Sequence, residues 1–545
     1  MKKLIIIFLL ASATQAFSQD WPLKKLVTDR LLKNIPFIQM PGFSFVSSQQ
    51  LADKGVYQAI KINADFSRQL LAQKPDAVQV EIPLDDNETL VVNLIKFDLG
   101  NIKFTENNNQ NEVVDNLKIP VTYRGIISGD TSRNNVVLTV NEDYVSMIAT
   151  SSKRTIQITK ADGLDKSLYR LYNSDKVQFP KPDFDCGTID KPLSKQEELL
   201  LSLPQQRSAA PPDKCVNVFV DCFDSLYYWK NSSYQQTINY VYELFNAVAA
   251  GYTNEQINIQ IIAVNVWTTP DPYRGDTRAN ALADLAANYK DNFWGNICVG
   301  LDYGLNTRSG LASIASAKGM APNTCPAYSV ATNPFCYCDV NYTSIATVKN
   351  FPTGPSATGA AIYLVMHEMG HLLGSRHTKW CGWQISTTPL VYGALDSCGI
   401  REVKDNVTPL CSAGPPPPAT GATIMSYCVS NNTASDFVNY NNGFGPLPGN
   451  AIRTFVYNNS CIAGCLVCIT GMNNPLKKME YSFNDNNSIG YKNIEPFSVF
   501  SLDHALDKKV SYTNNEGENA YLKYKFQNLQ STYNSKKTGY IISKN

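Results

Sequence analysis

Eleven residues in the second half of the chain carry three of its four histidines, in the run His367-Glu368-Met369-Gly370-His371-Leu372-Leu373-Gly374-Ser375-Arg376-His377. On a helix, residues four apart share a face one turn apart, so His367 and His371 can bind one metal ion. Glu368 stands beside them, where a carboxylate can accept and return a proton. Gly374 is placed to end the helix and turn the chain back, so that His377 can supply a third ligand.

These residue types predict a zinc ion that activates water. Three imidazoles leave one coordination position open, whereas structural zinc sites are usually closed by four ligands and are rich in cysteine. Zinc lowers the pKa of its bound water to about 7, and Glu368 would take the proton as hydroxide attacks a peptide carbonyl. The alternatives are a helix with unrelated surface histidines and a non-catalytic zinc site. The third histidine argues against the first alternative, and Glu368 argues against the second.

Composition and the N-terminus point to an exported protein of several domains. A length of 545 residues predicts two to four modules. Lys and Arg number 48 and Asp and Glu number 47, so no nucleic-acid footprint and no basic membrane-binding surface is indicated. Lys2 and Lys3 precede the apolar run Leu4 to Ala11, and small residues follow at Ala16-Phe17-Ser18. This pattern is typical of a signal peptide and is too short to span a bilayer, although a buried N-terminal strand is the alternative. No later segment reads as a membrane span, so a secreted or surface-associated protein is expected.

The distribution of the fourteen cysteines also matters. None lies in residues 1–185, and thirteen lie from Cys215 to Cys468, so an exported chain would carry disulfides in its second half. The short pairs Cys336-Tyr337-Cys338 and Cys465-Leu466-Val467-Cys468 are too isolated for a convincing four-cysteine zinc site. Cys186 stands alone upstream of the histidines. Its thiolate can occupy the open zinc position and keep an enzyme inactive, or it can form a disulfide with the second half.

The order of patterns predicts an α+β fold. Residues 19 to about 190 read as a β-rich module, with alternating runs at Val78–Ile82, Leu90–Phe97, Val136–Val140 and Tyr144–Ile148. A polar, proline-containing linker covers about residues 191–213. Strands and helices then alternate, which predicts a mixed, mostly parallel sheet with an α/β-like first half. The predicted elements are strands at 216–222, 257–267, 297–301 and 311–315, and helices at 234–249, 277–289, 357–373 and 449–457.

The histidine run matches the extended signature His-Glu-x-x-His-x-x-Gly-x-x-His of the metzincin metallopeptidases. Ile424-Met425-Ser426-Tyr427 resembles the methionine turn of the same family. The resemblance implies that Met425 forms the structural floor of the zinc site and is not a ligand. Tyr427 stands where some metzincins place a tyrosine that can bind zinc. A buried, hydrogen-bonded tyrosine is the alternative for that position.

Within the metzincins the chain is most similar to the reprolysin (adamalysin)-like group, and to its bacterial members in particular. The resemblance is carried by Gly374-Ser375-Arg376-His377-Thr378, by the cysteines that follow, and by a last helix ending near Cys461. Cys186-Gly187 resembles the cysteine switch of reprolysin propeptides, which implies Cys186 as the propeptide's zinc ligand. Thr378 departs from the aspartate of eukaryotic reprolysins, and pappalysin-like metzincins share this threonine.

We therefore expect a secreted zinc endopeptidase that is made as a zymogen and cleaves proteins or peptides. The expected order is a signal peptide (1–18), a propeptide (19–207), a metzincin domain (208–465) and a small β-rich module of unknown role (466–545). One catalytic Zn²⁺ is implied. Structural Ca²⁺ is compatible with the family, but no residues indicate a site, and nothing indicates an oligomeric state. A binding protein on a metzincin scaffold is the alternative function, and the intact set of His367, Glu368, His371 and His377 argues against it.

Overall fold

The structure is a computed structural model that divides into two compact units, residues 1–471 and 472–545. It describes residues 21–33, 35–51, 55–85, 87–107, 112–142, 144–160, 167–173, 186–190, 214–273, 277–289, 293–304, 310–314, 316–317, 334–339, 359–403, 410–418, 421–428, 442–462, 488–491 and 520–523. The predicted signal peptide and the predicted boundary at residue 207 lie outside these ranges.

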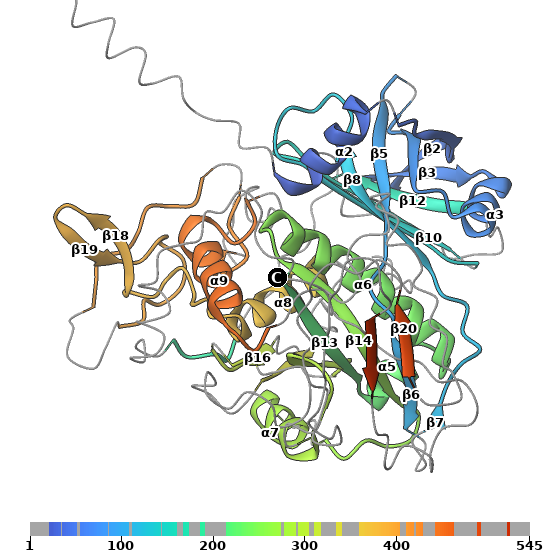
Figure 1. The fold of residues 1–545 in the computed structure, drawn as a ribbon. Coiled ribbons are helices and arrows are strands. Elements are labelled where there is room, and N and C mark those ends of the chain that lie inside the picture. Colours follow the sequence, from blue (N-terminus) through green and yellow to red (C-terminus); the bar gives the residue numbers. More distant parts are fainter. Residues whose placement is uncertain are drawn as a thin grey trace, which may run out of the picture. The chain divides into compact units, whose positions relative to one another are not determined.

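Described residues between 21 and 173, here called the N-terminal module, form a ten-stranded sheet (Figure 1). Its neighbouring strands are antiparallel, except for the parallel pair at one edge, β1 with β4. Alternate residues of β4 are fully buried, as expected for a strand that covers a core with one face. The β-rich character predicted for this region is confirmed. In spatial order the strands are β1 (Ile38–Pro41), β4 (Ala77–Pro83), β5 (Thr89–Phe97), β8 (Val121–Ile127), β9 (Asn135–Val140), β10 (Val145–Thr150), β11 (Thr155–Lys160), β12 (Leu168–Asn173), β3 (Gly55–Ile62) and β2 (Phe43–Leu51), with helices α2 (Pro22–Leu32) and α3 (Ala64–Gln73) beside them.

A second sheet, here called the central sheet, has seven strands, most of which lie after the N-terminal module in sequence. Its spatial order is β16 (Gly310–Ala312), β17 (Phe335–Asp339), β15 (Ile297–Asp302), β13 (Cys215–Cys222), β14 (Asn258–Trp267), β6 (Lys103–Asn107) and β7 (Glu112–Val113). Only the outermost strands, β16 and β7, are antiparallel to their neighbours. The predicted mixed, mostly parallel sheet is thus confirmed.

Two strands of the central sheet come from the N-terminal module. β6 pairs in parallel with β14 and carries β7 on its outer side. The predicted boundary at residue 207 divides the chain in sequence, whereas this sheet joins residues on both sides of it. In the sequence KFTEN of β6 only Phe104 is buried, so the segment lacks the repeated alternation that marks a strand.

Helix α6 (Tyr234–Asn254) lies between the two sheets (Figure 1). Ser233 caps its N-terminus, because the Ser233 side chain accepts a hydrogen bond from the backbone N–H of Gln236. Every residue from Thr237 to Asn254 is buried, because β8 and β9 cover one side of the helix while β14 and α8 (Gly359–Leu372) cover the other. The remaining helices are α5 (Asp224–Trp229), α7 (Arg278–Tyr289) and α9 (Pro446–Asn458).

Disulfides hold the irregular segment that follows α8. Cys381 pairs with Cys411, and the hairpin of β18 (Trp383–Thr387) and β19 (Leu390–Gly393) lies between these two cysteines in sequence. Cys398 pairs with Cys428 after the hairpin. In the second unit β20 (Ser488–Tyr491) pairs with β21 (Ala520–Lys523). Among the residues that the structure describes, no helix is long and apolar enough to cross a membrane.

Candidate metal centre

Helix α8 carries the first two histidines and is held in place by α6. Gly251 of α6 faces Met366, and a Cβ atom at Gly251 would lie 2.3 Å from the Met366 methyl carbon. The hydroxyl of Tyr252 donates to the Met366 carbonyl at 2.9 Å. The end of the Met366 side chain therefore packs directly on Gly251, and the Tyr252 hydrogen bond ties α6 to the backbone of α8 next to His367.

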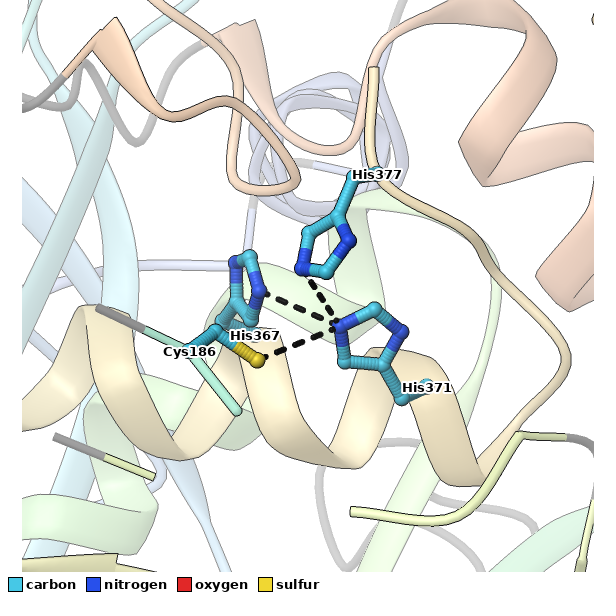
Figure 2. A group of neighbouring side chains, drawn as sticks. All are labelled: Cys186, His367, His371 and His377. Carbon is cyan, nitrogen blue, oxygen red and sulfur yellow. Dashed lines mark hydrogen bonds between the residues drawn. The ribbon is translucent and has the colours of Figure 1, made fainter. Parts of the chain in front are cut away.

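The three histidines meet at one point (Figure 2). His371 Nε2 lies 3.2 Å from His367 Nε2 and 3.1 Å from His377 Nε2. Gly374, with φ of +96°, follows the end of α8, and the backbone N–H of Ser375 bonds back to the Gly370 carbonyl at 2.9 Å. The chain therefore turns at Gly374 and brings His377 to the other two rings.

The outward nitrogen of each ring has a hydrogen-bond acceptor. Nδ1 of His367 donates to the Ile424 carbonyl at 2.7 Å, and Nδ1 of His371 donates to the Ser375 carbonyl at 2.9 Å. Nδ1 of His377 contacts the Asp190 carboxylate at 3.0 Å. A carbonyl can only accept, so the proton of these imidazoles is on Nδ1 and the lone pair on Nε2 faces the common centre.

Burial also keeps the rings neutral. All three side chains are fully buried, and desolvation lowers the pKa of His367 and of His371 well below the ordinary value. The same cause, helped by the charge of Lys379, lowers the pKa of His377 to about 3. Neutral imidazoles are the form that binds a metal ion.

Cys186 completes this group from a separate segment, residues 186–190, here called the strap. Its Sγ lies 3.7 Å from His371 Nε2, and the four ligand atoms all lie within 4.8 Å of one another. Cys186 is not in a disulfide, in contrast to the alternative weighed from its position in the sequence. Burial, followed by the charge of Glu368, raises the pKa of the Cys186 thiol well above its usual value in the absence of a cation. A bound metal ion has the opposite effect on a thiol.

The donor set fits a tetrahedral zinc ion. With ordinary zinc–ligand bond lengths, two nitrogens of such a site lie ~3.3 Å apart, and a nitrogen and a sulfur lie ~3.6 Å apart. The distances from His371 Nε2, of 3.1, 3.2 and 3.7 Å, are close to these values. Three neutral imidazoles and one thiol are also ligands that zinc prefers.

Glu368 lies fully buried beside this group on α8. Neither carboxylate oxygen has a hydrogen-bond partner among the described residues, which is unusual for a buried charged group. Gly310 of β16 leaves room for it, since a Cβ atom at Gly310 would lie 2.4 Å from Glu368 Oε1. Burial raises the pKa of Glu368 to about 8. An unsatisfied carboxylate next to a metal site is suited to exchange a proton with a reacting molecule.

The strap is bound along the edge strand of the central sheet. The backbone N–H of Gly187 donates to the Gly310 carbonyl at 2.9 Å, and Cys186 and Gly310 form a parallel β-bridge. The Thr188 hydroxyl bonds both the N–H and the carbonyl of Ala312 at 3.0 Å. The strap therefore occupies backbone groups of β16 that an added extended chain would use.

Asp190 is a site residue that the sequence analysis missed. Its Oδ2 accepts hydrogen bonds at 3.0 Å from both the backbone N–H and Nδ1 of His377. Burial raises the pKa of the Asp190 carboxyl to about 7, although the charge of Arg376 opposes the change. In the sequence, the only sign of this role is that an acidic residue stands four positions after Cys186. Such a spacing is too common to identify a site residue.

Met425 and Tyr427 both lie at the centre, in different roles. Met425 is fully buried. Its sulfur packs against Gly370, which lies on the turn of α8 between His367 and His371, and a Cβ atom at Gly370 would be 2.9 Å from that sulfur. The ring of Tyr427 is 4.8 Å from that of His377, and its hydroxyl donates to the Cys186 carbonyl at 2.8 Å. In this structure the Tyr427 hydroxyl therefore holds the strap.

A family model agrees with the chemistry of the site. Residues 213–437 match the family model Reprolysin_5, described as metallo-peptidase family M12. The match confirms the resemblance to reprolysin-like metzincins. No match was found among curated proteins. Among solved structures the chain is similar to the crystal structure of metalloproteinase-II from Bacteroides fragilis, with 10% sequence identity and a TM-score of 0.34 over 58% of this chain and 86% of that chain.

Proposed function

Since residues 213–437 match the model of a reprolysin-like domain of metallo-peptidase family M12, we propose that this chain is the zymogen of an exported zinc endopeptidase. His367, His371 and His377 hold the zinc ion and Glu368 is the general base. The observation that carries the proposal is the convergence of three Nε2 atoms whose rings are oriented from behind by Ile424, Ser375 and Asp190. Proteins or peptides are the substrates of such a family.

Each residue then has a defined part in hydrolysis. A zinc ion bound here would supply a Lewis acid that acidifies water and polarises the scissile carbonyl. Glu368 accepts the proton of the attacking water on a carboxylate oxygen and passes it to the leaving amine. Gly310 and Ala312 of β16 offer a carbonyl and an N–H that can pair with the backbone of an extended substrate.

Latency of the precursor rests on the strap. Cys186 would supply the fourth zinc ligand, and Gly187 and Thr188 occupy the edge of β16. Substrate and strap need the same backbone groups, so both cannot bind at once. Removal of the strap is therefore the activating step in this proposal, and Asp190 and Tyr427 hold it in addition to Cys186.

Excision of the strap is expected to produce a protease. Recognition sequences for a site-specific protease would replace residues 176–181 and 203–208, on either side of the strap, in the otherwise complete chain. After both cuts we expect hydrolysis of casein that a zinc chelator stops and added Zn²⁺ restores. A doubly cut protein that binds zinc and is folded but cleaves neither casein nor a peptide library would favour a binding protein instead.

Cys186→Ser is expected to make the uncut precursor active. A serine hydroxyl does not ionise as a thiol does, so the fourth ligand is lost while the strap keeps its other contacts. We expect at least ~10-fold more peptide hydrolysis by the uncut variant than by the uncut wild type, since a weakened ligand favours exchange of the strap for substrate. Cys222→Ser is the matched control, because Cys222 is also a buried cysteine outside a disulfide but does not belong to the metal-binding group. A Cys186→Ser precursor as latent as the wild type would rule out the thiol as the main lock.

A further inference from the structure

Strand β6 of the N-terminal module forms part of the central sheet of the peptidase domain. It pairs with β14 from Lys103 opposite Ala263 to Asn107 opposite Trp267. Side chains add to the ladder: Thr105 Oγ1 bonds Asn265 Oδ1 at 2.9 Å. Without β6, the edge of β14 would present unpaired backbone donors and acceptors.

The segment before β6 also approaches β14 closely. The Leu99 carbonyl accepts the backbone N–H of Ile261 at 2.8 Å. Gly100 follows with φ of +122°, and a Cβ atom there would lie 2.6 Å from the Ile261 carbonyl oxygen. The contact thus requires glycine both for its conformation and for its spacing.

Helix α6 meets the N-terminal module through buried polar groups. Arg124 Nε donates to Asn246 Oδ1 at 2.9 Å, and Asn246 Nδ2 donates to the Leu138 carbonyl at 3.1 Å. The Glu243 carboxylate accepts from the hydroxyl of Tyr144 at 3.1 Å and from that of Ser146. These partners come from both sides of the predicted boundary, so separation would break an extensive set of buried hydrogen bonds.

Apolar packing is continuous across the same contact. One hydrophobic core contains Ile95, Phe97 and Phe104 of the module together with residues of α6, β13 and β14. The rings of Phe104 and Tyr242 are stacked with centroids 6.4 Å apart. A shared core is typical of a permanent association and unlike the small polar contact of a segment that is readily released.

We propose that the N-terminal module remains bound to the peptidase domain after the linker has been cut, as a non-covalent subunit that completes the central sheet. The inference rests on the proposed zymogen only in assuming that the linker is cut. In a simple propeptide, the N-terminal module and the strap would leave the enzyme together. The strap leaves the metal centre, whereas the module stays with β14 and α6.

Retention would also affect activation. The strap follows the module in sequence, so a cut on its C-terminal side alone leaves it tethered to a bound subunit. A short tether gives an effective concentration in the millimolar range. A second cut between the module and the strap is then needed for full activity.

Masses of the cut protein test the proposal without use of activity. The chain with a single recognition sequence at residues 203–208 would be cut completely and examined by size-exclusion chromatography and native mass spectrometry. We expect both fragments to co-elute at the mass of the uncut protein and to separate only in denaturant. The doubly cut protein, which lacks the strap, should co-elute in the same way. An N-terminal fragment that elutes alone in either case would overturn the proposal.

A matched pair of variants locates the contact. Phe104→Ala removes a ring that packs on α6, whereas Phe43→Ala removes a ring that packs on Phe66 and Tyr169 inside the module. We expect Phe104→Ala to speed dissociation of the doubly cut complex at least ~10-fold, as truncation of a buried interface anchor does, and Phe43→Ala to leave the rate within ~2-fold. Equal effects of the two variants would contradict the assigned contact, and thermal unfolding of the uncut variants would verify that both fold.

Discussion

Glu368→Gln is expected to lower kcat about a thousand-fold in the doubly cut enzyme, within the range for loss of a general base. Glutamine has the size of glutamate but cannot accept the proton of water at neutral pH. The variant should still bind about one zinc ion per chain, since Glu368 does not belong to the group of converging ligand atoms. Kinetics on a fluorogenic peptide, with zinc content by mass spectrometry, would measure both effects.

The fold should tolerate this substitution. Burial raises the pKa of Glu368 to about 8, which means that the charged carboxylate is disfavoured at its position. A neutral amide avoids that cost, so the melting temperature of Glu368→Gln should equal or exceed that of the wild type. Glu142→Gln, at an exposed carboxylate paired with Lys118, is the control and should keep wild-type kinetics. Wild-type turnover in Glu368→Gln would show that another group is the base.

His371→Ala is expected to abolish both metal binding and hydrolysis. His371 Nε2 is the atom that contacts each of the other three ligand atoms, so it lies at the middle of the group. Loss of a residue that only orients a ligand costs 10–100-fold in metal affinity, and loss of a ligand itself should cost more than ~100-fold. Isothermal titration calorimetry of the metal-free precursor with Zn²⁺ would measure the change in zinc affinity.

Thermal stability gives a second measurement for His371→Ala. Zinc binds the folded wild-type precursor and should raise its melting temperature, whereas the variant should show little increase at the same zinc concentration. His504→Ala is the control, because His504 is the one histidine outside the motif. Stoichiometric, tight zinc binding by His371→Ala would contradict the assigned ligand set.

The helices and strands whose residues repeat with a regular hydrophobic period could be predicted from the sequence. Helix α8 was predicted at 357–373 and spans Gly359–Leu372, because apolar residues and the histidine spacing both follow the helical period. The strand at 216–222 and the helix at 234–249 were predicted for the same reason, although α6 continues to Asn254. The convergence of His377 follows from Gly374, whose backbone conformation favours glycine.

Long-range pairing is what the sequence did not predict. Strand β17 includes Cys336 and Cys338, which carry no strand signal as an isolated cysteine pair, yet its buried residues pair in parallel with β15 and antiparallel with β16. Strand β6 has one buried apolar residue and a partner about 160 residues away. Asp190 gave no signal because its role depends on where the strap crosses His377. Parallel partners and contacts of this kind are set by tertiary packing and not by the local period.

The origin of β6 also bears on the order in which the protein folds. All ten strands of the first sheet lie between residues 38 and 173, so that sheet can form before residue 214 has been synthesised. Strand β14 then meets a partner, β6, whose ends are held by β5 and β8 of that sheet, although parallel pairing between distant segments is ordinarily slow. The N-terminal module is therefore expected to serve as a template during biosynthesis, and a peptidase domain made without it would expose the edge of β14 to aggregation.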